Sequence, residues 1–600
     1  MAEELLLGLG SIIALGIAAQ WLSWRLRFPA ILLLLIFGII AGPVWGIVEP
    51  DTLFGDLLFP LVSVSVAIIL FEGGLSLRIA ELRQVGTVVR NLTTIGIIVT
   101  WILATLAAII IIGLPWRLAA FLGAILVVTG PTVIIPLLRQ IRPMGNVGPI
   151  IRWEGIVNDP FGAILAVVVF EALLAGGIGE SNTLAIIGVV KALFFGGAIG
   201  LGGALVMVLL LRYYLIPDFL QNPVSLMFVV VSYVTANMAQ AESGLLAVTI
   251  MGIALANQKY VSIKHITEFK ENLRVLLISS LFIILAARLT VEHLKLFDLT
   301  NWLYVIVLIL VVRPVAVHLS TLGSSLNIKE KIFLGWMAPR GIVAAAVSSV
   351  FAVRMAEIGY PNTENLVALV FQVIIGTVAI YGISALLVAR ALKLSQANPQ
   401  GVLFIGAQPW VQSLAAALRD EGFKVALVDS NWLNITSARK AGCRAYYADA
   451  LSENLLGDLQ LDGIGRLMAL TPNDEVNALA ALHFVDIFGR NDVYQLPPGN
   501  MAKKRIASHL RGRFLFAEQA NYDHLTERFQ AGAVVKKTEI TEEFDYKDFL
   551  KYYGGSAMPL LAITESGSLK IFTLDSKPSL QPGQKLVSIV RPVETGEHKK

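Results

Sequence analysis

The stretch GAILVVTGPTVIIPLLRQ, residues 123–140, is apolar enough to enter a membrane, yet it holds helix breakers at its centre. Gly130 and Pro131 lie in the middle of the stretch, and Pro136 follows shortly after them. Proline has no backbone N–H, and its ring disturbs the preceding helical turn. The stretch therefore predicts a membrane helix interrupted near its midpoint, with backbone carbonyls such as that of Thr129 left free to bind a cation.

A second stretch, IFLGWMAPRGIVAAAVSSV at residues 332–350, is interrupted at a comparable depth. One such segment alone is most simply an ordinary proline kink. Paired interruptions in corresponding positions of two halves are instead typical of transporters built from inverted repeats, whose binding site lies near the midplane. The matched placement favours the transporter interpretation, in which the broken helices support the site through Gly130 and Pro131, and through Pro339 and Arg340.

Composition extends this interpretation to most of the chain. Of the 600 residues, 56% are hydrophobic and only 15% are charged, whereas soluble domains average about 25% charged residues. Up to about Leu392, apolar runs are long enough to cross roughly 30 Å of hydrocarbon. We expect a polytopic α-helical membrane domain over residues 1–395. Its spans, about 13 in number, fall near 4–24, 29–48, 57–77, 87–113, 117–139, 147–175, 184–211, 223–240, 243–258, 272–290, 299–321, 331–354 and 364–390.

The charges of the loops alternate along the chain. Every second loop is basic, while the intervening loops carry acids. The basic loops include Arg78 and Arg83, Arg139 and Arg152, Arg212, Lys259, Lys264 and Lys270, and Lys329 and Lys331. Basic loops are cytoplasmic by the positive-inside rule. The sequence thus predicts a multi-pass protein of the cell inner (plasma) membrane, with the N-terminus outside and the C-terminal domain in the cytoplasm.

One predicted span carries polar residues at its start. It reads IRWEGIVNDPFGAILAVVVFEALLAGG, residues 151–177, and contains Glu154, Asn158 and Asp159. Charged residues at such a depth are costly and usually face the bundle interior or a water-filled cavity. A carboxylate there can hold either a proton or a cation. Competition between the two at Asp159 is sufficient for exchange if the site opens to one side at a time.

The neighbours of Asp159 predict the stoichiometry. Asn158 is uncharged, so one exchangeable carboxylate favours one proton per monovalent cation, with no net charge moved. Glu154, Arg313 and Arg340 also have apolar stretches around them. For these charges a role in function competes with a buried ion pair that only fixes helix packing, and one Glu–Arg pair among them fits that alternative.

Several separated motifs carry a family resemblance. They are FEGGLSL (71–77), TGPTVIIPLL (129–138), EGIVNDP (154–160), SGLLAV (243–248), LLISSLFIILAARL (276–289), VVRPVAV (311–317) and GWMAPRGIVAAAV (335–347). In this order they resemble the cation/proton antiporter superfamily, and most closely its sodium/proton exchanger branch with the Asn-Asp motif. The resemblance covers nearly all of residues 1–392.

The resemblance implies a homodimer whose core contains crossed, unwound fifth and twelfth helices. It further implies that Asp159 carries both cation and proton with Asn158 and Thr129 in support. By the same resemblance, Glu154 pairs with Arg313. Two departures bear on the cation. Many exchangers have an acid where Gly130 stands and a serine where Gly155 stands. Sodium is slightly favoured by the resemblance, and the loss of both ligands leaves potassium as the alternative.

The tail after residue 395 has the composition of a soluble domain. The segment GVLFIGAQPWVQSLAAALRDEGFKVALVDSNWLN, residues 401–434, predicts strand, helix and strand, and further alternation predicts a doubly wound parallel sheet. We expect a Rossmann-like regulatory domain over 396–500, which resembles the regulator-of-potassium-conductance (TrkA-N-like) domain. Residues 501–600 would complete the tail with a small β-rich module.

The nucleotide signal in the tail is weaker than the fold signal. A dinucleotide fingerprint needs Gly-x-Gly-x-x-Gly, but Gly406 is followed by Gln408 and Val411 at the other two positions. Asp429 still suits a ribose hydroxyl, and Asp449 ends the next strand. NAD(H) or an adenine nucleotide at these residues competes with a degenerate fold that only dimerises. No cofactor is required for transport, and no catalytic constellation appears.

Three classes of function follow from these features. The first is an electroneutral Na⁺/H⁺ or K⁺/H⁺ antiporter regulated by its tail, the K⁺ form being gated by nucleotide. The second is a ligand-gated potassium channel, but the Thr-Val-Gly-Tyr-Gly filter loop is missing from the sequence. The third, a membrane oxidoreductase, lacks redox ligands. We therefore predict a secondary transporter that is not an enzyme. Its partners would be the lipid bilayer, Na⁺ or K⁺, H⁺ and a second copy of the chain, and it would bind no nucleic acid.

Overall fold

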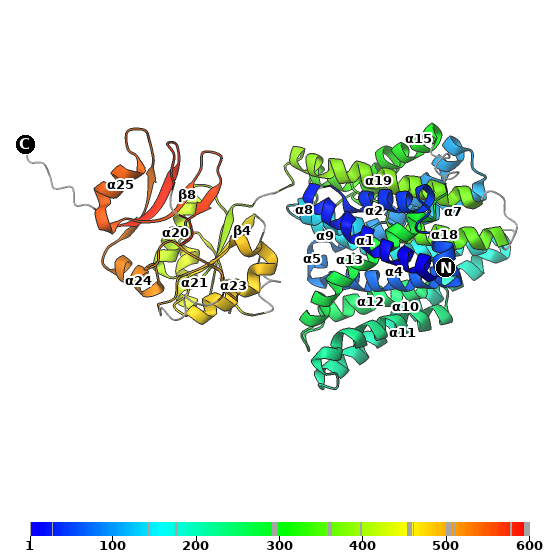
Figure 1. Cartoon of the computed structure of the whole chain (residues 1–600), viewed down its shortest axis with the longest axis horizontal. Helices are drawn as coiled ribbons and strands as arrows, with labels where there is room; N and C mark the ends of the chain where they lie inside the picture. Colours follow the sequence, from blue (N-terminus) through cyan, green and yellow to red (C-terminus); the bar gives the residue numbers. More distant parts are fainter. Residues whose placement is uncertain are drawn as a thin grey trace, which may run out of the picture. The chain divides into compact units, whose positions relative to one another are not determined.

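The computed structural model describes residues 2–26, 28–141, 143–174, 178–290, 298–357, 363–395, 399–452, 459, 461, 463–499, 507, 510–576 and 579–592. The chain divides into two compact units, Met1–Ser395 and Gln396–Lys600. The first is a bundle of helices and the second is an α/β unit (Figure 1). This division coincides with the change in composition at residue 395.

Helices form the first unit. They are α1 (Ala2–Leu26), α2 (Ala30–Ile39), α3 (Pro50–Phe54), α4 (Leu58–Leu75), α5 (Ile79–Asn91), α6 (Ile97–Ala107), α7 (Trp116–Ile125), α8 (Pro131–Ile141), α9 (Val147–Leu174), α10 (Ile178–Arg212), α11 (Gln221–Ala239), α12 (Ser243–Asn257), α13 (Lys264–Ala287), α15 (Leu299–Val307), α16 (Arg313–Ser320), α17 (Ile328–Trp336), α18 (Ile342–Glu357) and α19 (Thr363–Ala391). Within the described ranges, some of these helices continue into π-helical turns, which are η1 (Ile40–Val44), η3 (Leu92–Gly96), η4 (Ala108–Ile112) and η6 (Leu308–Val312).

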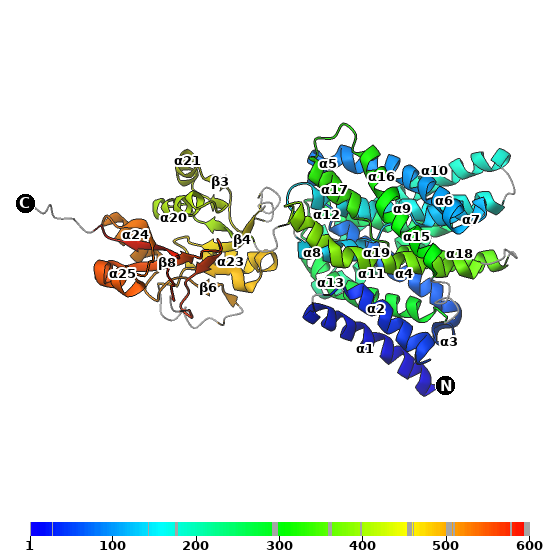
Figure 2. The ribbon, with the colours of Figure 1, turned by 90° about the horizontal axis from the view of Figure 1, so that it is seen from above.

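Every predicted span overlaps one of these helices or a run of them. Among the described residues, 8 helices are long and apolar enough to cross a membrane, and shorter apolar helices include Trp116–Ile125 and Ile342–Met355. Those two shorter helices belong to the stretches with central Gly and Pro residues. In Figure 2, α1 lies along one edge of the bundle.

The two predicted interruptions are confirmed. The backbone leaves the helical path between α7 and α8, over residues 126–130, and again between α17 and α18, over residues 337–341. Both gaps contain the prolines or glycines expected to break the helix. Each half-helix therefore ends inside the bundle, where its terminal backbone groups need partners.

The second unit contains a six-stranded parallel sheet with the order β3-β2-β1-β4-β5-β6. Its strands are β1 (Gly401–Ile405), β2 (Val425–Asp429), β3 (Arg444–Tyr447), β4 (Ile464–Ala469), β5 (Val493–Gln495) and β6 (Arg513–Phe514). The helices α20 (Pro409–Asp420), α21 (Trp432–Lys440) and α23 (Asp474–Phe488) alternate with the strands. The predicted doubly wound fold is confirmed, with Pro409 in the first turn of α20 and Gly422, at φ +85°, after its end.

The boundary expected at residue 500 does not follow this sheet. Strand β6 pairs in parallel with β5 through Tyr494 and Arg513, so the sheet takes its last strand from beyond residue 500. A strand of 2 residues carries too little periodicity to be recognised in sequence. The Rossmann-like sheet therefore extends into the segment that we expected to be a separate module.

A second, antiparallel sheet with the order β7-β10-β8-β9 follows, as expected for a β-rich module. It contains β7 (Val534–Glu539), β8 (Met558–Ile563), β9 (Leu569–Ile571) and β10 (Lys585–Val590), with α24 (Tyr522–Gln530) and α25 (Tyr546–Tyr553) beside it. Side chains from both sheets, including Phe404, Leu561 and Ile589, share one hydrophobic cluster. Helix α20 supplies Leu414 and Leu418 to the same cluster and packs against β2 of the first sheet and β7 of the second, so it joins the two sheets in one core.

Glu421, at the end of α20, joins this helix to the second sheet through ion pairs. Its carboxylate accepts hydrogen bonds from Lys585 Nζ at 2.8 Å and from Lys537 Nζ at 3.1 Å. These bonds, first that from Lys585 and then that from Lys537, hold the pKa of Glu421 below its usual value. Such partly exposed pairs each contribute about 0.2–1 kcal/mol.

We expect Glu421→Gln to lower the tail's melting temperature at neutral pH by a small amount. Because the folded pKa is depressed, the stabilisation is complete above the unfolded pKa of about 4.3 and is lost as pH falls through the folded value. Thermal unfolding of the full chain from pH 7 to pH 3 checks this, with the exposed Glu543→Gln as control. A wild-type advantage that is as large at pH 3 as at pH 7 would contradict the assignment.

Candidate cation-binding site

The site is built where the two broken helices cross. The N–H of Gly130 donates to the carbonyl oxygen of Pro339 at 2.9 Å. A Cβ atom added to Gly341 would stand 2.5 Å from the Cα of Gly130, closer than real contacts allow. Glycine at both positions thus permits the two unwound segments to touch, and one backbone hydrogen bond ties them together.

Asp159 lies beside this crossing on α9 and is completely buried, with 0% exposure. Neither carboxylate oxygen has a hydrogen-bond partner within the described part of the chain. The backbone N–H of Thr129 lies near the carboxylate but outside normal hydrogen-bond geometry, and the charge of the Arg340 side chain also acts on it. Buried carboxylates are normally paired. Both oxygens of Asp159 therefore remain able to bind a proton or a cation.

Asn158 and Thr129 are also buried, at 4% and 3% exposure. The Oδ1 atom of Asn158 has no partner among the described residues. The hydroxyl of Thr129 donates to the carbonyl oxygen of Gly155 at 3.0 Å, and this bond fixes the unwound segment against α9. A hydroxyl that donates its proton keeps its lone pairs, so Thr129 can still face a cation.

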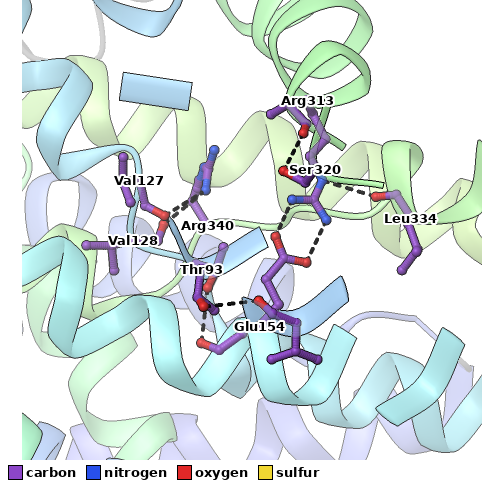
Figure 3. Close-up of polar contacts among 12 residues, drawn as sticks. Thr93, Val127, Val128, Glu154, Arg313, Ser320, Leu334 and Arg340 are labelled. Carbon is purple, nitrogen blue, oxygen red and sulfur yellow. Dashed lines mark hydrogen bonds and ion pairs between the residues drawn. The ribbon is translucent and has the colours of Figure 1, made fainter. Parts of the chain in front are cut away.

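Glu154 and Arg313 form a buried ion pair. Figure 3 shows their side chains pointing toward each other, Glu154 from α9 and Arg313 from the start of α16. Arg313 Nη2 donates to Glu154 Oε2 at 2.9 Å, and Nη1 donates to Oε1. Arg313 Nε also donates to the carbonyl oxygen of Leu334 at 3.1 Å, near the end of α17. The contact expected from the resemblance is thus present, and it neutralises Glu154.

Arg340 acts on the backbone of the opposite broken helix. Its Nη1 atom donates to the carbonyl oxygens of Val128 and Val127 at 3.2 and 3.4 Å (Figure 3). These carbonyls lie where α7 has ended, so they need donors. Arg340 therefore stabilises the interruption that Pro131 creates, while its backbone N–H donates to the hydroxyl of Thr377 at 3.3 Å.

Sequence reasoning missed a second buried charge cluster. We expected Lys270 in a basic loop, but it lies inside α13 with 1% exposure, and its Nζ is 3.6 Å from the ring centroid of Phe71. Nearby, Arg274 Nη1 pairs with Glu72 Oε1 at 2.7 Å. Helix α13 begins at Lys264, ahead of the expected span, and this early start carries Lys270 into the bundle. Lys270 is buried because α13 packs against α4, and the sequence around Lys270 carries no local pattern that signals this contact.

In the tail, Gly406 and Asp429 come together as expected for neighbouring strands of a parallel sheet. However, Asp429 Oδ2 accepts from Ala407 N at 2.8 Å and from Asn434 Nδ2 at 2.9 Å. Its Oδ1 accepts from Asn431 N at 2.8 Å. A carboxylate offers about four acceptor sites, so little capacity remains for two ribose hydroxyls. The residues present fit a dinucleotide poorly.

Asp449 is likewise engaged locally, since its Oδ1 accepts from Leu451 N at 2.9 Å. A cavity of about 540 Å³ does occur in the tail, lined among others by Gly401, Lys424, Glu565 and Lys585. Gly401 begins β1, whereas Gly406 follows its end. The cavity therefore lies at the amino ends of the strands, whereas the expected nucleotide residues lie at their carboxyl ends.

Comparison with known proteins bears on the membrane unit first. The family described as the transmembrane sodium/hydrogen exchanger matches residues 10–391, which include both broken helices and Asp159. The chain belongs to this family. A TrkA-N domain matches residues 402–495, in agreement with the parallel sheet.

Individual relatives of this exchanger chain are distant. Na(+)/H(+) antiporter 1 of Methanocaldococcus jannaschii is 26% identical over 416 residues, covering 66% of this chain and 95% of that protein. The K(+)/H(+) antiporter NhaP of Alkalimonas amylolytica is 28% identical over 403 residues, covering 66% and 68%. The structure of the sodium proton antiporter MjNhaP1 from Methanocaldococcus jannaschii at pH 8 covers 65% of this chain with a TM-score of 0.58 and 23% identity. That likeness shows the same fold.

Proposed function

We propose that this exchanger is a secondary transporter, and not an enzyme, that exchanges one monovalent cation for one proton at Asp159. The observation that carries the proposal is a fully buried carboxylate without a partner among the described residues, beside two unwound segments. A carboxylate in that position needs either a proton or a metal ion to offset its charge. Na⁺ and K⁺ are the candidate cations, since relatives bear both names.

The charges around the crossing support electroneutral exchange. Glu154 is neutralised by Arg313, Asn158 is uncharged, and Gly130 contributes no acid. One carboxylate therefore takes one proton or one monovalent cation, so the loaded forms carry equal charge. Unequal stoichiometry would need a second free acid at the crossing.

Reconstituted vesicles test this proposal. With a proton gradient across the membrane, adding Na⁺ or K⁺ should move protons in the direction opposite to the cation. An imposed membrane potential should leave the equilibrium distribution of the ions unchanged, because no net charge crosses. A potential that shifts that distribution would refute the one-to-one exchange, and a current without proton movement would identify a channel.

The proposal extends to the surroundings of the site. The chain would form a homodimer in the inner membrane, with basic loops and the tail in the cytoplasm, as the loop charges indicate. The tail would regulate transport. NAD(H) or an adenine nucleotide is a candidate signal, and one bound near Gly406 and Asp429 would compete with the hydrogen bonds that Asp429 already accepts. The full chain can be titrated with NADH and with ATP while the melting temperature and the transport rate are measured. No shift in either quantity would exclude these nucleotides as the signal.

A further inference from the structure

Thr132 has a buried hydroxyl that the fold leaves without a partner. The residue stands in the first turn of α8 with 5% exposure, and its Oγ1 makes no hydrogen bond to any described residue. Folded proteins satisfy the large majority of buried polar side-chain atoms. A helical threonine usually donates to the carbonyl four residues earlier. For Thr132 that carbonyl belongs to Val128, which lies in the unwound segment before α8 and accepts from Arg340.

Other buried threonines of the bundle behave differently. Thr249 on α12 donates to the carbonyl of Leu245 at 2.7 Å, and Thr377 on α19 donates to that of Val373 at 2.7 Å. Both follow the usual helical pattern. The unpartnered hydroxyl of Thr132 is therefore a feature of its position and not of buried threonines in general.

The hydroxyl of Thr132 lies at the crossing of the broken helices. Its Oγ1 lies 3.5 Å from the point where a Cβ on Gly341 would stand, and that same point is 2.5 Å from the Cα of Gly130. The unpartnered oxygens of Asp159 and Asn158 belong to the adjacent helix α9. Asp159 is linked electrostatically to Arg340 and Thr129, the residues that flank these two glycines. Unpartnered oxygens thus lie on α8 and α9, the two helices that border this crossing.

We propose that the Thr132 hydroxyl is a ligand of the transported cation and that it gives the site its preference for potassium. This inference rests on the proposed exchange at Asp159. Oxygen ligands suit alkali cations, and the number and field strength of such ligands influence the choice between K⁺ and Na⁺. One carboxylate with neutral hydroxyl and amide oxygens makes a weaker field than two carboxylates would. Dehydration costs less free energy for K⁺ than for Na⁺, so a weak field offsets it more fully for K⁺.

Thr132→Val tests the ligand, because valine keeps the shape of the side chain and removes only the hydroxyl. In vesicles holding the full chain, we expect the half-saturating K⁺ concentration to rise roughly tenfold, as for a lost interaction of about 1.4 kcal/mol, and to rise less for Na⁺. Thr132→Ser should restore the wild-type values. Thr249→Val is the matched control, since it removes a buried hydroxyl whose bond lies within α12.

The outcomes separate this inference from the proposed function. If the wild type moves protons with K⁺ and Thr132→Val leaves the half-saturating concentrations of both cations unchanged, Thr132 is not a ligand and only the inference fails. If Thr132→Val changes both cations equally, the ligand stands and its role in selectivity fails. If the wild type couples no cation to protons, the proposed function itself fails. Melting temperatures of the variants in detergent show whether each is folded.

Discussion

Replacing Asp159 with asparagine should reduce cation-coupled proton movement to the level of empty vesicles. The side chain is completely buried and its oxygens have no hydrogen-bond partner within the described structure. The substitution removes the negative charge and the titratable proton but keeps the size of the side chain. Asparagine can neither exchange a proton nor balance the charge of a cation, so both halves of the cycle fail together.

The same substitution should leave the fold intact, since it breaks no ion pair or side-chain hydrogen bond of Asp159 to the described residues. We expect the melting temperature in detergent to stay the same or to rise, because a neutral amide is less costly to bury than a lone carboxylate. Glu171→Gln is the matched control. Glu171 lies on the same helix α9 but is exposed, and its variant should exchange ions normally. Exchange that survives in Asp159→Asn would overturn the assignment of the carrier.

Sequence predicted the parts of this architecture that depend on local composition. The interruptions at residues 126–130 and 337–341 could be foreseen, because each apolar run combines glycine with proline at its centre and the two runs occupy matched positions. Pro136 and Pro160, by contrast, lie inside α8 and α9. The alternation of strands and helices in the tail was visible for the same reason, as each element carries its own hydrophobic period. These predictions needed no knowledge of which segments meet.

Contacts between distant segments were not accessible in the same way. Glu154 and Arg313 are 159 positions apart, and their pairing was foreseen only through the resemblance. The bond from Thr129 to Gly155, the burial of Lys270 and the engagement of Asp429 all depend on how packed elements face each other. A polar residue in sequence does not reveal whether its hydrogen bonds are already made. For Asp429 and Thr132 that distinction decides what each can bind.

Breaking the Glu154–Arg313 pair should destabilise the bundle strongly. Glu154→Met leaves the Arg313 guanidinium buried with the carbonyl of Leu334 as its remaining hydrogen-bond acceptor in the described structure. Arg313→Met leaves the Glu154 carboxylate buried without the two bonds it now accepts from Arg313. Removing one member of a buried pair costs about 3–5 kcal/mol, whereas replacing both with apolar residues of similar volume is often neutral or stabilising. We therefore expect each single variant to melt well below the wild type, and the double variant Glu154→Met with Arg313→Met to recover most of the loss.

Transport by the double variant then distinguishes the two roles open to this pair. Recovery of both melting temperature and exchange means that the pair fixes the packing of α9 against α16 and that Asp159 works without it. Recovery of the melting temperature alone means that the charges of Glu154 and Arg313 act on the ion, for instance through the field at the crossing. Losses that simply add in the double variant would contradict the pairing itself, because residues in direct contact are expected to show a coupling of about 0.5–3 kcal/mol. Since the pair neutralises Glu154 in the proposed stoichiometry, a fully active double variant would also leave one free carboxylate at the site, as one-to-one exchange requires.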